Sequence, residues 1–174
     1  MSFFKTRSDY FKYLSSANII VAHGIDVGGV VRKSFHRIND DEELAAACVN
    51  FAHFPCVAHI GYNGRYSERP NELKKRRLTN GLLFLDKVPN PNSMDDRENA
   101  YDRAFEVMEQ FIAAMLYDFE SKGQCSNFQN LDLSLFNFDM YGPLNATLYG
   151  WLLTFVDEQM GISLLQYDPS KWNY

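Results

Sequence analysis

Cysteine is scarce in this chain, and long apolar runs are absent. Three cysteines occur in 174 residues, Cys48, Cys56 and Cys125, and an odd, sparse set does not make a disulfide framework. The longest apolar runs, Ile19–Ala22 and Leu82–Leu85, are far shorter than the roughly 20 residues that a membrane helix needs. We therefore predict a protein of a reducing compartment with no membrane span.

The first residues also lack the continuous apolar core of a signal peptide, because Lys5, Arg7 and Asp9 interrupt it. Positive charge is in short supply as well, since the formal net charge is −5. Nucleic acids and anionic membranes are themselves negative, so this balance disfavours non-specific binding to either. We expect a cytosolic chain with no membrane partner and no specific nucleic-acid binding.

A phosphate-binding loop is missing too. The stretch Gly29–Ser34 ends like one, but the motif requires glycine immediately before the lysine, and Arg32 stands in that place. The sequence therefore gives no sign of a nucleotide-binding loop, and we expect no cofactor.

Apolar and aromatic side chains, by contrast, are plentiful. Hydrophobic residues make up 46% of the chain and aromatic residues 15%, which is enough for a core and for an additional apolar interaction surface. A domain of this length buries about 70% of the surface that its unfolded chain exposes. No internal repeat or low-complexity linker divides the sequence. We predict a single domain spanning residues 1–174.

Apolar periodicity predicts three helices. The clearest runs from about Asp96 to Lys122, with one broad apolar face and Asp95 at its start. Two shorter helices are predicted nearer the N-terminus, over residues 2–16 and 39–51. Between these two, the segment 19–35 is rich in glycine and valine, and it is typical of a loop between short strands.

Alternating apolar residues predict two β-hairpins. The predicted strand pairs are 56–62 with 77–88 and 131–141 with 146–156. The first hairpin has a long polar loop, residues 63–76, and the second has a turn at Gly142 and Pro143. In the strand 131–141 the apolar alternation changes phase between Leu135 and Phe136, which predicts a β-bulge there.

The last strand is apolar on both faces, with Tyr149 and Trp151 on one face and Leu148 and Leu152 on the other. We therefore expect it to be a central strand or an interface strand. The predicted fold class is α+β: an antiparallel sheet of two hairpins packs against one long amphipathic helix, and shorter helices precede it.

Positive charge concentrates in one stretch. We define the basic stretch as Arg65, Arg69, Lys74, Lys75, Arg76 and Arg77. On so acidic a chain, these cations suit docking on an acidic neighbouring subunit or on a phosphate backbone. The alternative is a solubilising loop that protects a strand edge. The irregular C-terminal segment 162–174, which contains Trp172, is predicted to be a docking tail.

Two cysteines and two histidines lie within twelve residues and carry metal-ligand chemistry. This Cys–His group consists of Cys48, His53, Cys56 and His59. Cys56 and His59 are three residues apart on a predicted strand, so they project to opposite faces of the sheet. Nothing near Cys56 marks a thiol of low pKa, which a nucleophile would need. We interpret the group as buried cysteines and ordinary histidines, with no metal.

Four short segments share their arrangement with one family. They are Phe35–Arg37 before an acidic helix start, Phe54–Val57 at the opening of a strand, the long helix after Asp95, and the closing segment Tyr149–Leu152. This layout resembles the tail terminator or tail-completion (neck) proteins of phages and prophages of Bacteroides-like bacteria. The resemblance implies an antiparallel sheet flanked by helices and a ring that closes the tail tube and meets the connector. It implies no cofactor and no catalytic residue.

The leading hypothesis is therefore a non-enzymatic virion structural or assembly protein, a ring-forming tail terminator or head–tail joining component. Its expected partners are further copies of itself and the neighbouring tail-tube and connector proteins. Its expected location is the virion, after assembly in the host cytoplasm.

Two other classes of function stay open. One is a small zinc- or nucleic-acid-binding regulatory protein that uses the Cys–His group and the basic run 74–77. The other is an enzyme of unrecognised type, which a pocket joining His23, His36 or His59 to a carboxylate would favour.

Overall fold

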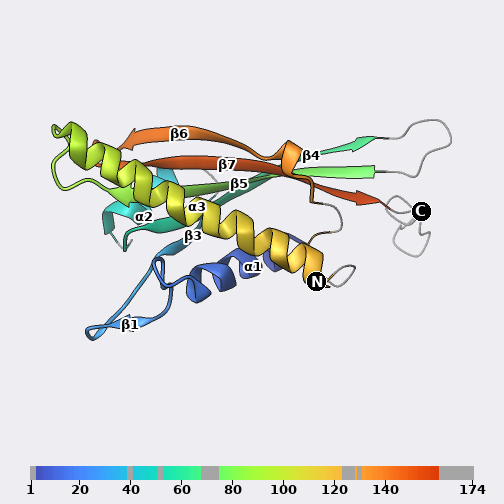
Figure 1. Cartoon of the computed structure of the whole chain (residues 1–174), viewed down its shortest axis with the longest axis horizontal. Helices are drawn as coiled ribbons and strands as arrows, with labels where there is room; N and C mark the ends of the chain where they lie inside the picture. The colour runs from blue at the N-terminus through green and yellow to red at the C-terminus, as the bar shows by residue number, and fades with distance from the viewer. Residues whose placement is uncertain are drawn as a thin grey trace, which may run out of the picture.

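The computed structural model describes residues 3–38, 41–50, 53–67, 75–122, 128 and 131–160. Within them the chain forms helices and strands in the α+β arrangement predicted from the sequence (Figure 1). In chain order the elements are α1 (Phe3–Ala17), β1 (Asp26–Val27), β2 (Val30–Val31), β3 (Phe35–Ile38), α2 (Asp41–Asn50), β4 (Cys56–Ser67), β5 (Lys75–Lys87), α3 (Met94–Lys122), the 3-10 helix η2 (Leu133–Leu135), β6 (Asn137–Leu144) and β7 (Leu148–Met160).

The main sheet has the strand order β3-β4-β5-β7-β6. The hairpins β4–β5 and β6–β7 are those predicted, and β5 joins them by pairing antiparallel with β7. The prediction of a purely antiparallel sheet is wrong at one edge, because β3 pairs with β4 in parallel. A parallel pair requires a crossover connection, and the segment containing α2 provides it.

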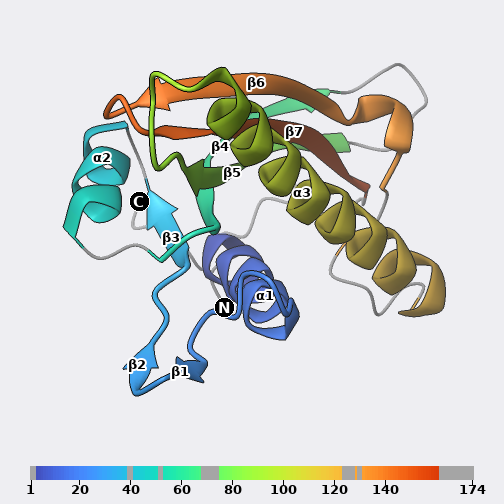
Figure 2. The same ribbon diagram turned by 60° about the vertical axis from the view of Figure 1, so that its left-hand side comes forward.

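Helices cover both faces of this sheet (Figure 2). On β5, Leu82 and Phe84 pack into the cluster formed with α1 and α3, where the Phe84 and Phe111 rings lie 5.2 Å apart. The alternate residues Leu83 and Leu85 pack into the cluster formed with α2. Because side chains alternate between the two faces of a strand, the same segment of β5 contributes to the cores on both sides of the sheet.

Strand β7 is a central strand, as its two apolar faces predicted. It lies between β5 and β6, with Leu153 in the α1–α3 cluster and Leu152 against the α2 cluster. Gly150 sits where a Cβ atom would meet the Phe84 carbonyl oxygen on β5. The close approach of these two strands therefore requires glycine at this position.

The predicted polar loop 63–76 is strand at both of its ends, and its residues 68–74 lie outside the described part of the chain. β4 continues to Ser67 and β5 begins at Lys75, with Arg65 opposite Arg77 in the ladder. Lys75 also pairs with Met160 of β7. Backbone hydrogen bonds to neighbours on both sides of β5 override the polar composition that suggested a loop.

The start of the second hairpin also differs from the prediction. Where a β-bulge was predicted between Leu135 and Phe136, the chain forms η2, and β6 begins only after it. Asp132 begins η2, because its side chain accepts a hydrogen bond from Ser134 N. The change of phase in the apolar pattern thus reflects a turn of helix outside the strand.

The turn of that hairpin is displaced towards β7. It is formed by residues 145–147, where Asn145 and Ala146 have φ of 49° and 62°. Gly142 and Pro143, predicted to form the turn, lie instead at a shift in register within β6. Asparagine tolerates positive φ better than other non-glycine residues, which places the turn at Asn145.

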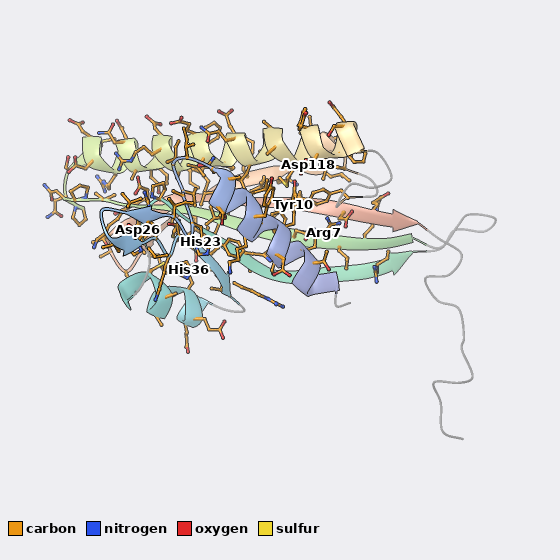
Figure 3. All side chains as sticks on the ribbon, turned by 90° about the horizontal axis from the view of Figure 1, so that it is seen from below. Arg7, Tyr10, His23, Asp26, His36 and Asp118 are labelled. Carbon is orange, nitrogen blue, oxygen red and sulfur yellow. The ribbon has the colours of Figure 1, made fainter. Side chains whose placement is uncertain are left out.

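The three helices match their predicted ranges closely. The start of α3 is capped by Ser93, whose Oγ accepts a hydrogen bond from Asp96 N at 3.2 Å, and not by Asp95 as predicted. Helices α1 and α3 are linked where the Tyr10 hydroxyl donates to Asp118 Oδ2 at 3.0 Å (Figure 3). Among the described helices, none has the length and apolar character to cross a membrane.

Candidate functional site

A short β-hairpin projects from the body of the molecule (Figures 1 and 2). In it β1 pairs antiparallel with β2, so that Val27 lies opposite Val30. Gly28 and Gly29 form the two-residue turn between them, and both have positive φ, which favours glycine. We call residues 24–32 the arm.

The arm exposes aliphatic side chains to solvent. Ile25, Val27, Val30 and Val31 are each 48–54% exposed. Val27 and Val30 are cross-strand partners on the same face of the hairpin as Ile25, whereas Val31 shares the other face with Asp26. Isolated apolar residues are common on protein surfaces, but three on one face of a small projection are of the kind that marks an interaction site.

The base of the arm is held in place by side-chain hydrogen bonds. His23 Nδ1 accepts from the backbone N–H groups of Ser34 and Phe35 at 3.1 and 3.0 Å. Arg32 Nη2 donates to the carbonyl of Phe54 at 2.7 Å. Because these bonds connect the arm to β3 and to the segment before β4, the arm leaves the sheet at a defined place.

A second apolar surface lies on β6. Phe138 is 49% and Met140 is 60% exposed, and β6 pairs with β7 on one side while its other side is an edge of the sheet. The Phe138 ring packs edge-on against Phe105 and Trp151, at 5.7 and 5.9 Å. We call the unpaired backbone side of β6, together with Phe138 and Met140, whose side chains project from the face towards α3, the β6 edge.

The strand order places these two surfaces at opposite edges of the sheet. The arm runs directly into β3, which is one edge strand, and β6 is the other. A contact between the arm of one copy and the β6 edge of another would therefore join two different surfaces, and such a contact repeats from copy to copy.

Comparisons with known proteins identify no relative. The chain matches no protein-family model, no curated protein and no solved structure. The surfaces of the chain itself are therefore the basis for proposing a function.

The basic stretch is only partly described. Arg65, Lys75, Arg76 and Arg77 lie on β4 and β5 and not on a loop, and Arg77 forms an ion pair with the buried Glu158 of β7. Arg69, Lys74 and Trp172 lie outside the described residues, as does the predicted tail 162–174. Arg77, which was predicted to contact a partner, is thus paired with Glu158 of its own chain.

The Cys–His group does not converge on one point. The thiols of Cys48 and Cys56 are neighbours, and the hydrogen bond between them lowers the pKa of Cys48. The same bond, together with burial, raises the pKa of Cys56. His59 lies on the other face of the sheet, bonded to Ser8 of α1, as the spacing predicted. His53 Nδ1 accepts instead from the backbone N–H of Lys33.

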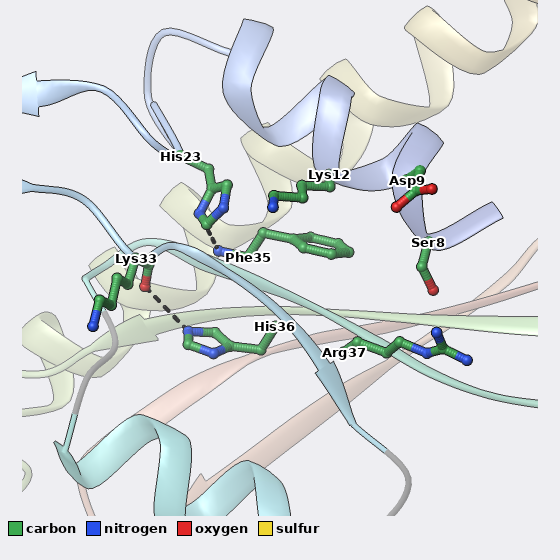
Figure 4. Close-up of a pocket in the computed structure, with 8 residues that line it drawn as sticks. All are labelled: Ser8, Asp9, Lys12, His23, Lys33, Phe35, His36 and Arg37. Atoms are coloured by element: carbon green, nitrogen blue, oxygen red, sulfur yellow. Dashed lines mark hydrogen bonds between the residues drawn. The ribbon is translucent and has the colours of Figure 1, made fainter. Parts of the chain in front are cut away.

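A pocket of about 630 Å³ lies between α1, β3 and the base of the arm (Figure 4). Its described lining consists of Ser8, Asp9, Lys12, His23, Lys33, Phe35, His36 and Arg37. Sequence reasoning did not find this pocket, because α1 and β3 meet only in the folded chain.

The pocket brings two histidines and a carboxylate to one place, but it does not pair them. His23 accepts from backbone N–H groups, and His36 Nε2 bonds to the carbonyl of Lys33 at 3.1 Å. Asp9 lies at the other end of the pocket, with Lys12 between it and His23 (Figure 4). Burial lowers the pKa of both histidines, so neither is set up as a base oriented by an acid.

Ser8 and His59 form a buried pair beside the pocket. Ser8 Oγ and His59 Nδ1 are 2.7 Å apart, and burial, followed by the charges of Arg37 and Arg7, lowers the pKa of His59 to about 4. A histidine with so low a pKa is a weak base at neutral pH. Asp9 follows Ser8 directly on α1 and therefore faces another direction. This arrangement fits a structural hydrogen bond.

Proposed function

We propose that this protein is a non-enzymatic assembly subunit that forms a ring-shaped homo-oligomer. The arm of one copy lies on the β6 edge of the next. The observation that carries the proposal is the position of two exposed apolar surfaces at opposite edges of one sheet. A heterologous contact of this kind closes into a ring when the rotation between copies allows it.

The chemistry of the two surfaces is complementary. The arm brings Ile25, Val27, Val30 and Val31, and the β6 edge brings Phe138, Met140 and the backbone groups of an edge strand. Covering each half-exposed aliphatic side chain contributes about 1 kcal/mol. Strand addition to a free edge supplies backbone hydrogen bonds as well.

Within this proposal, the ring is a tail terminator or head–tail joining component of a virion. Its neighbours are the tail-tube and connector proteins. The resemblance in layout supports this part, together with the apolar surfaces that suit an assembly and the bonding of His23 and His36 to backbone groups.

Substitutions on the two surfaces test the contact. Val27→Asp on the arm and Met140→Lys on the β6 edge are each expected to weaken self-association at least tenfold, because each places a charge in an apolar interface. Sedimentation velocity and negative-stain microscopy measure the change. Met94→Lys is the matched control, since Met94 is 65% exposed but lies outside both surfaces.

Mixing the two variants gives a sharper result. The Val27→Asp chain keeps an intact β6 edge and the Met140→Lys chain keeps an intact arm, so the mixture should form a one-to-one dimer and nothing larger. Failure of the mixture to form this dimer, or equal dissociation by Met94→Lys, contradicts the proposed contact. A wild-type chain that stays monomeric at high concentration and does not bind tail tubes contradicts the assembly role.

A further inference from the structure

The pocket between α1 and β3 is electropositive on an acidic protein. Its described lining contains three cations, Lys12, Lys33 and Arg37, against one carboxylate, Asp9, whereas the whole chain has a net charge of −5. Like charges gathered around a concave surface repel one another, and an anion bound among them relieves that repulsion.

The two histidines of the pocket are held in defined tautomers. His23 Nδ1 accepts from two backbone N–H groups, so its ring proton is on Nε2, and that N–H is the donor left for a ligand. His36 Nε2 donates to the Lys33 carbonyl, which leaves its Nδ1 as an acceptor. Protonation of His23 would add a hydrogen to Nδ1, which would then face the N–H groups of Ser34 and Phe35 as one donor against two others. The His23 ring therefore stays neutral.

The pocket has two polar ends with an aromatic ring between them (Figure 4). Lys12 lies beside His23, Lys33 lies on the other side of His23 with its ammonium directed away from Lys12, and Asp9 and Arg37 lie at the opposite end of the pocket. Phe35 lies between the two ends, and the His23 ring meets it edge-on at 6.0 Å. The volume of about 630 Å³ is that of a site for a small organic molecule, and it far exceeds the need of a single inorganic ion.

We propose that this pocket binds a nucleoside phosphate. The phosphate lies between Lys12 and the Nε2–H of His23, which are donors that suit phosphate oxygens. The planar base packs on Phe35. At the far end, the edge of the base donates to Asp9 and accepts from Arg37. This inference does not depend on the oligomeric state of the chain.

Titration with GMP tests the inference, because guanine presents adjacent N–H donors to a carboxylate and a carbonyl oxygen to an arginine. Isothermal titration calorimetry on the full chain should show saturable binding of GMP. Guanosine and inorganic phosphate should each bind at least tenfold more weakly, since each satisfies one end of the pocket. Absence of GMP binding at millimolar concentration overturns the proposal, and so does phosphate binding as tight as that of GMP.

Two substitutions locate the binding. Lys12→Glu should weaken GMP at least tenfold and should also abolish the weak binding of phosphate. Phe35→Leu should weaken GMP severalfold and leave phosphate unchanged, because it removes only the aromatic face. Lys87→Glu makes the same charge change on an exposed lysine of β5 outside the pocket and should have no effect. GMP binding that survives Lys12→Glu, or that is lost equally in Lys87→Glu, contradicts the assignment of this pocket.

Discussion

Asp157→Asn is expected to lower the free energy of unfolding by about 3–5 kcal/mol. Asp157, on β7, forms a fully buried ion pair with Arg7 of α1, whose side chain is 2% exposed. The Arg7 guanidinium carbon also lies 4.0 Å from the centre of the Phe128 ring. Arginine stays charged in proteins, so the substitution leaves a positive charge inside the core without the carboxylate that balances it.

Urea denaturation of three variants separates the cost of an unbalanced charge from the value of the pair. Arg7→Met/Asp157→Leu replaces both charges by apolar groups and should recover most of the lost stability. Arg103→Gln removes a cation that is 49% exposed from its pair with Asp86, whose side chain is 7% exposed. It should cost less, about 1–2 kcal/mol, because water reaches the Arg103 side of the pair and Asp86 keeps its hydrogen bond from Lys87 N. Equal losses in Asp157→Asn and Arg103→Gln would contradict the buried-pair explanation.

The free energy of unfolding is expected to fall by about 3 kcal/mol between pH 7 and pH 4 through His59 alone. The folded pKa of His59 is about 4 against an ordinary value of 6.5, chiefly because the ring is buried. Between these values the unfolded chain binds a proton that the folded chain does not. The stabilisation is therefore complete above pH 6.5, is lost as the pH falls, and changes no further below pH 4.

Comparison of the wild type with His59→Gln isolates this contribution. His23 and His36 also have lowered pKa values, but they are present in both chains and cancel in the difference. Urea denaturation at pH 7.5 and 4.5 should show the stability gap between wild type and variant narrowing by about 2–3 kcal/mol. A gap that stays constant would mean that His59 titrates normally in the folded protein.

The helices were the part of the fold that sequence reasoning located best. Helix α3 is 29 residues long and its apolar stripe runs from Tyr101 to Phe119, and so long a periodic pattern is hard to mistake. Strand ends were located less well. The polar residues of β4 and β5 between Asn63 and Arg76 suggested a loop, yet they pair in register with each other and with β7, because pairing depends on the neighbouring strand as much as on composition.

The candidate sites differ in how visible they are in the sequence. The pair Gly28–Gly29 between valines is a recognisable hairpin signal, so the arm itself was within reach of sequence reasoning. Its exposure was not, since apolar valines usually indicate burial. The pocket could not be predicted from the sequence, because Lys12 and Arg37 lie on different elements, and no pattern in the sequence indicates that these elements pack together.

The α+β class, the three helices, the two hairpins and the central place of β7 follow from the amino-acid sequence, because each rests on the local spacing of apolar side chains. Four features are set by the folded arrangement of the chain: the parallel pairing of β3, the burial of Arg7 against Asp157, the opposite placement of the arm and the β6 edge, and the pocket lined by Lys12, Phe35 and Arg37. These features depend on contacts between residues that are distant in the chain, and the local pattern of residues in the sequence does not indicate such contacts.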